Sequence, residues 1–287
     1  MKSLSILIGI GPLFFAGCAV SPENTSADEQ AVQGSEVTCT LPSPVPPPSP
    51  EWSYHEETTG VDVWGTLPGY ETCDTGLAQS PIHLDDATTS YSALELAFLD
   101  YDARVPLDIT DNGHTLQVNV SGGAATPAIT YDGETYHLIQ LHWHATSEHT
   151  LSFGPDAPLE VHLVHRTADG AKLAVVGVLY EEGAEDRVLA AALANAPGPR
   201  SRHVCSADIR LRDLLPADRS FYHYGGSLTT PTCAEGVSWF VMTNRLTSAA
   251  EQAAHFQERF HGTTNRPVQP RNGRVVTKFL DSSSGPH

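Results

Sequence analysis

The chain has 287 residues, of which 40% are hydrophobic, and a mean hydropathy of -0.21. This composition is typical of a globular protein with one large domain or two small ones. Its formal net charge of -18 argues against a nucleic-acid partner, because phosphate binding needs a positive field. We therefore expect no nucleic-acid partner and attribute the charge to a well-solvated acidic surface.

The first residues predict an export signal. Lys2 supplies a short positive region, and Leu4–Phe15 is an apolar stretch too short to span a bilayer. It ends in small residues followed by Cys18, which resembles a bacterial lipoprotein signal, cleaved after residue 17 so that Cys18 becomes lipid-modified. A conventional signal peptide with an incidental Cys18 is the alternative. Both interpretations predict an exported chain, and the lipoprotein interpretation predicts that residues 1–17 are removed.

Residues 18–50 are predicted to form a tether. The stretch Leu41–Pro50 is rich in proline and is expected to be extended, polyproline-like chain that acts as a semi-rigid spacer. Lipid on Cys18 would anchor the folded domain to a bacterial membrane, in the periplasm or at the cell surface. Ala19 is not an inner-membrane retention signal of the Asp type, which favours the outer membrane.

Short β-rich runs, separated by Gly, Asp, Asn and Pro, begin after Glu51. They cover Leu94–Phe98, Leu107–Thr110, Thr115–Val120, Thr135–Ala145, Leu159–Arg166 and Lys172–Tyr180. Helices are predicted over Glu185–Ala194 and over Ser248–Arg259, where a Ser-x-x-Glu capping pattern opens the second. Because strands outnumber helices and lack regular crossovers, we expect one α+β domain (51–281) around a large, mainly antiparallel sheet, with a flexible tail at 282–287.

Three histidines in this predicted sheet are spaced to bind a metal. Side chains alternate along a strand, so His142 and His144 share one face, and a neighbouring antiparallel strand can bring His162 to the same point. Three neutral imidazoles leave the fourth tetrahedral position of zinc open, as in catalytic sites. Gln140 and Glu160 lie on the same faces and can each accept the second ring N–H of a ligand. We expect one zinc ion per chain.

Other histidines are left out of this expected metal shell. The chain holds 14 histidines, and most histidines in proteins bind no metal. His165 has the wrong strand parity to join His162, and His149 lies in the connecting loop.

Export makes disulfides possible. Apart from Cys18, the chain contains an even number of cysteines, which allows three pairings: they are Cys39, Cys73, Cys205 and Cys233. Their spacing alone does not choose among these pairings.

Further motifs surround the histidines in chain order. They are Gln79-Ser-Pro-Ile82, Asn112-Gly-His114, Ser147-Glu-His-Thr150, Tyr224-Gly-Gly-Ser-Leu-Thr-Thr-Pro231 and Asn265-Arg-Pro-Val-Gln-Pro270. With the His-x-His and Glu-x-His core, this ordered set resembles the α-class carbonic anhydrases over roughly Trp52 to Leu280. The resemblance implies that family's fold and a zinc lyase that hydrates carbon dioxide reversibly to bicarbonate and a proton, by attack of zinc-bound hydroxide.

The resemblance also assigns roles to single residues. His142, His144 and His162 are the implied zinc ligands, with Gln140 and Glu160 as their hydrogen-bond partners. The implied apolar wall, where carbon dioxide rests beside the metal, comprises Val164, Val175, Leu228, Val237 and Trp239.

The remaining implied roles concern protons and product. Thr229 would accept a hydrogen bond from the hydroxide and donate its own to Glu148, while Thr230 would touch bicarbonate. His114 matches the family's proton shuttle, and we expect a partly exposed imidazole that titrates near neutrality. Thr264 stands near a position where the family often has Asn, a departure that bears on loop rigidity.

The same comparison implies a disulfide between Cys73 and Cys233, which would steady the loop that carries Thr229. Cys39 and Cys205 would then be left to pair with each other, which we state as a hypothesis because Cys39 lies in the expected tether.

Other functions remain as alternatives. One is a non-catalytic zinc-binding or adhesion module on the same fold, because a fold does not settle function. Another is a zinc-buffering lipoprotein, although the expected tether contains no histidine. Ester hydrolysis is expected only as a side activity of the same site.

Overall fold

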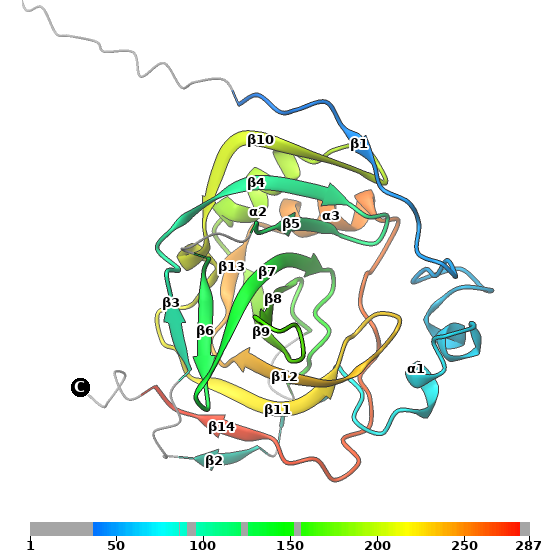
Figure 1. Ribbon diagram of the computed structural model, residues 1–287, viewed down its shortest axis with the longest axis vertical. Coiled ribbons are helices and arrows are strands. Elements are labelled where there is room, and N and C mark those ends of the chain that lie inside the picture. The colour runs from blue at the N-terminus through cyan, green and yellow to red at the C-terminus, as the bar shows by residue number, and fades with distance from the viewer. Residues whose placement is uncertain (1–36, 86, 91–95, 122–125, 152–155, 282–287) are drawn as a thin grey trace, which may run out of the picture. The chain divides into compact units, whose positions relative to one another are not determined.

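The computed structural model describes residues 37–85, 87–90, 96–121, 126–151 and 156–281 (Figure 1). The predicted signal peptide, Cys18 with its lipid, the first half of the predicted tether and the tail at 282–287 lie outside these residues. None of the helices in the described part of the chain combines the length and apolarity that a membrane span needs.

A large sheet dominates the described residues, and its central path runs β1-β10-β4-β5-β7-β8-β9-β12-β11-β14-β2 (Figure 1). In chain order the strands are β1 (Ser43–Pro44), β2 (Thr88–Ser90), β3 (Ala97–Leu99), β4 (Arg104–Asp111), β5 (Leu116–Asn119), β6 (Ala128–Tyr131), β7 (Glu134–His144), β8 (Glu160–Thr167), β9 (Leu173–Glu182), β10 (Ser201–Arg210), β11 (Phe221–Ser227), β12 (Glu235–Met242), β13 (Leu246–Ser248) and β14 (Thr277–Phe279). Within this sheet the pairs of β9 with β12, β9 with β13 and β2 with β14 are parallel, and the others are antiparallel. The predicted large, mainly antiparallel sheet is confirmed.

The central strands β7, β8 and β9 form where the sequence predicted strands. Most residues of β8 and β9 are buried, because apolar side chains cover both faces of the sheet there. Val161 and Val176 belong to the larger core on one face, whereas Val164 and Val175 belong to a second cluster on the other. This alternation fixes the face on which each histidine of β7 and β8 lies.

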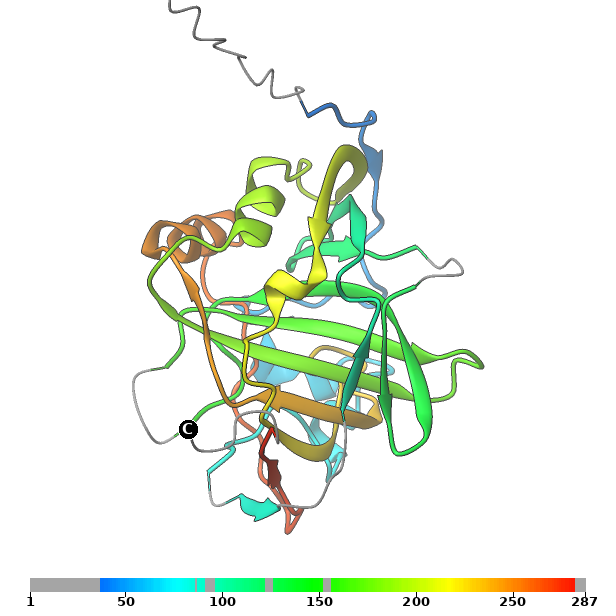
Figure 2. The same ribbon diagram turned by 90° about the vertical axis from the view of Figure 1, so that its left-hand side faces the viewer.

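Helices are few among the described residues. They are η1 (Val61–Thr66), α1 (Thr72–Thr75), α2 (Arg187–Ala194), η2 (Leu211–Leu214) and α3 (Ala250–Arg259). Helices α2 and α3 lie on the same side (Figure 2), where Leu189 and Phe256 join the larger core.

The predicted cap of the last helix is wrong. Helix α3 begins at Ala250, and the Gln252 side chain accepts a hydrogen bond from the Ala249 N–H at 3.1 Å. The same Gln252 oxygen accepts from the Asp186 N–H at 2.8 Å, and its amide donates to the Asp186 carbonyl. Gln252 rather than Ser248 caps the helix, because its one side-chain amide satisfies backbone groups at the starts of both α2 and α3.

The described part of the predicted tether is joined to the sheet. Strand β1 pairs with β10 in the register Pro44 to Ser201, and Cys39 forms a disulfide with Cys205. Residues 38–45 are therefore not a free spacer, because β10 presents an edge whose backbone groups they satisfy. Cys73 forms the second disulfide with Cys233, so the expected pairing of all four cysteines is confirmed.

Candidate metal centre

The histidines of β7 and β8 meet because of the strand register. His142 lies directly opposite His162, and His144 lies opposite Glu160. The ring centroids are 4.9 Å apart for His142 and His144, 5.3 Å for His142 and His162, and 4.6 Å for His144 and His162. One potential ligand nitrogen from each ring lies within 4.8 Å of the other two.

Two of these rings are oriented by the side chains that the sequence singled out. His142 Nδ1 lies 2.8 Å from Gln140 Oε1, and His162 Nε2 lies 2.9 Å from Glu160 Oε1. Because a carboxylate or amide oxygen accepts, these outer nitrogens carry the ring hydrogens. The inner atoms, Nε2 of His142 and Nδ1 of His162, are therefore free to act as electron-pair donors.

The third ring is held by a group that sequence reasoning missed. His144 Nδ1 donates to the backbone carbonyl of Thr264 at 2.6 Å. The Thr264 loop is itself fixed, because the Thr264 hydroxyl accepts from the Ala145 N–H at 3.0 Å. Every residue has a backbone carbonyl, so the sequence cannot indicate which one accepts from His144. Only the three-dimensional position of the Thr264 loop shows this.

The donor set fits a zinc ion. Burial lowers the pKa of His142, His144 and His162, that of His144 to about 4, and the neighbouring imidazoles lower the pKa of His142 further. All three rings are thus neutral at physiological pH, with their outer hydrogens engaged and three nitrogen lone pairs converging. Catalytic zinc sites have three protein ligands, such as three imidazole nitrogens, and keep the fourth coordination position open.

Glu148 lies beside these inner nitrogens. The residue is only 1% exposed; Oε1 accepts from the Arg266 N–H at 2.9 Å, and the nearby Thr229 side chain lowers the pKa of the carboxylate. Oε2 lies 3.5 Å from His144 Nε2 and 3.8 Å from His162 Nδ1, and it has no hydrogen-bond partner among the described residues. Burial raises the pKa of Glu148 to about 7.

Glu160 is part of a buried network that extends behind His162. Its Oε2 accepts from the backbone N–H groups of Glu148 and His149, each at 2.9 Å. His149 Nδ1 lies 2.7 Å from Glu160 Oε1, and His149 Nε2 lies 2.7 Å from the Tyr224 hydroxyl. Burial alone would raise the pKa of Glu160, but His149 and His162 hold it well below its usual range.

The two histidines that the sequence left outside the metal shell lie apart from it for different reasons. Both His149 nitrogens are engaged, one by Glu160 and one by Tyr224. His165 lies among the larger core on the opposite face, where its Nε2 meets the Tyr101 hydroxyl.

Apolar side chains form one cluster next to the three histidines. The Trp239 ring centroid lies 4.8 Å from that of His162, and the Trp239 N–H donates to the Ser227 carbonyl at 2.9 Å. The cluster contains the residues expected to form the apolar wall, with Leu228 packed against its buried members: Val164, Val175, Val237 and Trp239.

His114 lies in the turn between β4 and β5, where Gly113 has a φ of +89° that favours glycine. The Asn112 side chain accepts from the N–H groups of His114 and Thr115, each at 2.9 Å. This turn aims the imidazole at a cavity of about 100 Å³, whose walls also include His142 and Thr230.

The expected exposure of His114 is wrong. The residue is only 8% exposed, because its ring stacks on Trp52 at a centroid distance of 3.7 Å and an interplanar angle of 10°. Burial and the neighbouring Arg200 guanidinium lower the pKa of His114 to about 4, so in this conformation it does not titrate near neutrality. No sequence pattern signals this ring stacking, since Trp52 lies far away in the chain.

Comparisons with known proteins agree with this geometry. The family model of the eukaryotic-type carbonic anhydrases matches residues 59–279. The carbonic anhydrase of Pectobacterium atrosepticum is 39% identical over 235 residues, which cover 79% of this chain and 91% of that protein.

Solved structures give the same result. A hyperthermostable carbonic anhydrase from an active hydrothermal vent chimney is 37% identical, with a TM-score of 0.73 over 80% of this chain and all of that one. The α-carbonic anhydrase of Thermovibrio ammonificans, solved with the inhibitor sulfanilamide, is 36% identical, with a TM-score of 0.72 over 79% of this chain and 98% of that one. With its converging imidazoles, the chain belongs to the α-class, or eukaryotic-type, carbonic anhydrases, zinc enzymes that hydrate carbon dioxide reversibly to bicarbonate and a proton.

Proposed function

We propose that His142, His144 and His162 hold the catalytic zinc of this carbonic anhydrase. The observation that carries the proposal is the hydrogen-bond pattern, in which each ring gives its outer N–H to an acceptor and turns a lone pair inward. A zinc ion bound by three neutral imidazoles lowers the pKa of its water to about 7 and so supplies a nucleophile at neutral pH.

Thr229 and Glu148 are proposed to orient that nucleophile. In its ionised form the Glu148 side chain can only accept, so the Thr229 hydroxyl donates its hydrogen to it. The Thr229 oxygen is then left as an acceptor toward the cavity, which obliges the attacking oxygen to present its hydrogen to Thr229 and its lone pair elsewhere. The Arg266 N–H supports this role because it fixes the carboxylate from behind.

Carbon dioxide is proposed to rest against the apolar cluster. The substrate carries no charge, so an apolar surface next to the nucleophile receives it without desolvating a polar group. Val164, Val175, Val237 and Trp239 offer such a surface, with Leu228 at its margin. Thr230, on the wall of the metal cavity, is proposed to hydrogen-bond the bicarbonate product.

His114 is proposed to carry the proton from the cavity to solvent, since it lines the cavity and its Nε2 has no hydrogen-bond partner among the described residues.

Replacing His114 by alanine is expected to lower turnover in weak buffer about tenfold or more, because a positioned general base is lost. The rate constant kcat/KM stays unchanged, and imidazole buffer restores turnover. Stopped-flow hydration at several buffer concentrations measures this, and an unchanged kcat in weak buffer would contradict the role.

The whole proposal is tested by stopped-flow hydration of carbon dioxide with the protein as isolated, after chelation, and after zinc is restored. We expect activity to follow bound zinc, measured by elemental analysis on the same samples. Background hydration with zinc fully bound would favour a non-catalytic zinc-binding or adhesion module on this fold instead.

Export and anchoring belong to the same proposal. Two disulfides are typical of proteins in an oxidising compartment outside the cytoplasm, which supports export. The sequence around Cys18 supports lipid anchoring of the catalytic domain, in the periplasm or at the cell surface of a bacterium. Mass spectrometry of the mature N-terminus checks this, and a mature chain without lipid on Cys18 would remove the anchor.

A further inference from the structure

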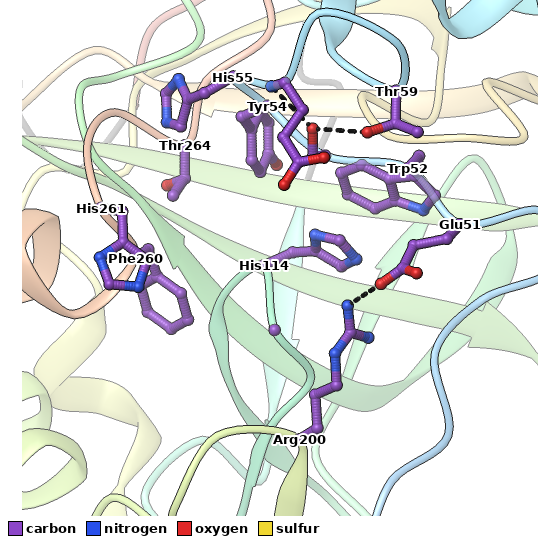
Figure 3. Close-up of a pocket in the computed structure, with 13 residues that line it drawn as sticks. Glu51, Trp52, Tyr54, His55, Thr59, His114, Arg200, Phe260, His261 and Thr264 are labelled. Carbon is purple, nitrogen blue, oxygen red and sulfur yellow. Dashed lines mark hydrogen bonds and ion pairs between the residues drawn. The ribbon is translucent and has the colours of Figure 1, made fainter.

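A second pocket, of about 340 Å³, lies next to the metal cavity (Figure 3). The two share Trp52, Tyr54 and His114 as wall residues. His114 therefore lies between the cavity that holds the metal ligands and a pocket whose far side includes exposed residues. Figure 3 shows the His114 ring between Trp52 and the Arg200 guanidinium.

Arg200 is held at this pocket by its backbone and by its side chain. Its guanidinium forms an ion pair with the Glu51 carboxylate. Its carbonyl accepts from the Val45 N–H at 2.8 Å, next to the pairing of β1 with β10, and its N–H donates to Asp111 Oδ1 at 3.4 Å. The disulfide-linked segment before Glu51 thus fixes both partners of the ion pair.

The guanidinium is fixed close to the His114 turn. A Cβ atom built on Gly113 would lie only 3.1 Å from Arg200 Cζ, so the side chain packs directly on this turn. Arg200 Nη1 and His114 Nε2 are both buried atoms without a hydrogen-bond partner among the described residues. A positive charge beside an imidazole opposes its protonation.

We propose that Arg200, held by Glu51, is a positioning residue that keeps the His114 imidazole uncharged and seated on Trp52, and thereby limits it as a proton acceptor. This inference rests on the shuttle role proposed for His114. Desolvation by burial is the larger cause of the lowered pKa of His114, and the charge of Arg200 is the second.

Other titratable and charged groups also surround His114 and contribute to the electrostatic environment of its ring. The titratable or charged groups that line its two cavities are Glu51, Tyr54, His55, Glu56, His142, His144, Arg200 and His261, and Asp111 accepts from the Gly113 N–H of its turn. Asp111 is paired with Arg259, and Glu51 with Arg200. Arg200 is thus the cation among them that packs on the His114 turn.

The decisive test compares two variants of one ion pair in the zinc-loaded enzyme. Arg200→Gln removes the positive charge and should raise the pKa of His114 by about one. Glu51→Gln leaves the guanidinium without its counter-ion and should lower the pKa of His114. NMR titration of the His114 ring proton, identified by its loss in His114→Ala, measures both. Loss of packing alone would move both variants in the same direction, so shifts of equal sign, or no shift, would overturn the inference.

Turnover provides an independent readout. In weak buffer, Arg200→Gln should raise kcat about threefold, because a gain in basicity is partly expressed in the rate of proton transfer, whereas kcat/KM should not change. Arg210→Gln, at the other end of β10, removes an equal charge from an exposed residue and serves as the control. If Arg200→Gln raises the pKa of His114 but leaves kcat unchanged, the kcat of His114→Ala in weak buffer distinguishes two explanations. A lowered kcat in that variant would leave the shuttle standing and overturn the limit set by Arg200. An unchanged kcat would overturn the shuttle.

Discussion

Replacing His162 by alanine is expected to reduce zinc affinity by more than about 100-fold and carbon dioxide hydration to background. Loss of a partner outside the ligand shell already costs about 10- to 100-fold in affinity, and loss of a ligand removes a bond to the metal itself. The change also leaves the buried Glu160 without the ring N–H that it accepts at 2.9 Å. Zinc titration with a competing chelator and stopped-flow hydration measure the two effects.

A fold control is needed because losing one hydrogen bond to a buried carboxylate costs roughly 1.5–3 kcal/mol, although Glu160 keeps its bonds to the Glu148 and His149 backbone and to the His149 ring. Thermal unfolding of the zinc-free wild type and variant shows whether His162→Ala still folds. His255→Ala, an exposed histidine on α3, should keep both zinc and activity. Rapid hydration by His162→Ala with zinc still bound would contradict the assignment of His162 as a ligand.

The centre of this fold could be predicted because its signals are local. In β7 and β8, strand parity alone separated His142, His144 and His162 from His165, which the structure puts on the opposite face. The apolar run of β9 likewise needs no partner to be recognised as a buried strand.

The peripheral strands were harder to predict because their pairing partners create them. Strand β10 is mostly polar, and about half of its residues are exposed. It is a strand because β4 pairs with one edge and residues 43–44 with the other. The same long-range pairing turned part of the expected tether into a segment of the sheet.

Two features of the site depend on contacts that no sequence pattern carries. The acceptor for His144 is the backbone carbonyl of Thr264, 120 residues away along the chain. The environment of His114 is set by Trp52 and Arg200, which come from segments far from its own turn. Family resemblance pointed to His114 as the proposed shuttle, whereas its burial and its charged surroundings could be found only in the structure.

Replacing Thr229 by valine is expected to lower kcat/KM for hydration on the order of 100-fold while zinc stays bound. Valine keeps the shape of threonine and removes only the hydroxyl that is proposed to donate to Glu148 and to accept from the attacking oxygen. Losing one oriented group at the reacting oxygen costs about 100-fold or more in enzymes of other classes, which corresponds to roughly 2.7 kcal/mol of transition-state stabilisation. Stopped-flow hydration, with zinc content measured on the same sample, gives the result.

Two matched variants decide whether the hydroxyl acts through its hydrogen bond. Thr229→Ser retains the O–H and should keep activity within several-fold of the wild type. Glu148→Gln retains the shape of the side chain but replaces a carboxylate, which only accepts, by an amide, which also donates. The amide introduced by Glu148→Gln can donate to the Thr229 oxygen, which would then no longer be reserved as an acceptor for the attacking oxygen. Glu148→Gln should therefore lose activity as Thr229→Val does, and the double variant should lose little more than either single one. Additive losses would show that Thr229 and Glu148 act separately and would overturn the orienting pair.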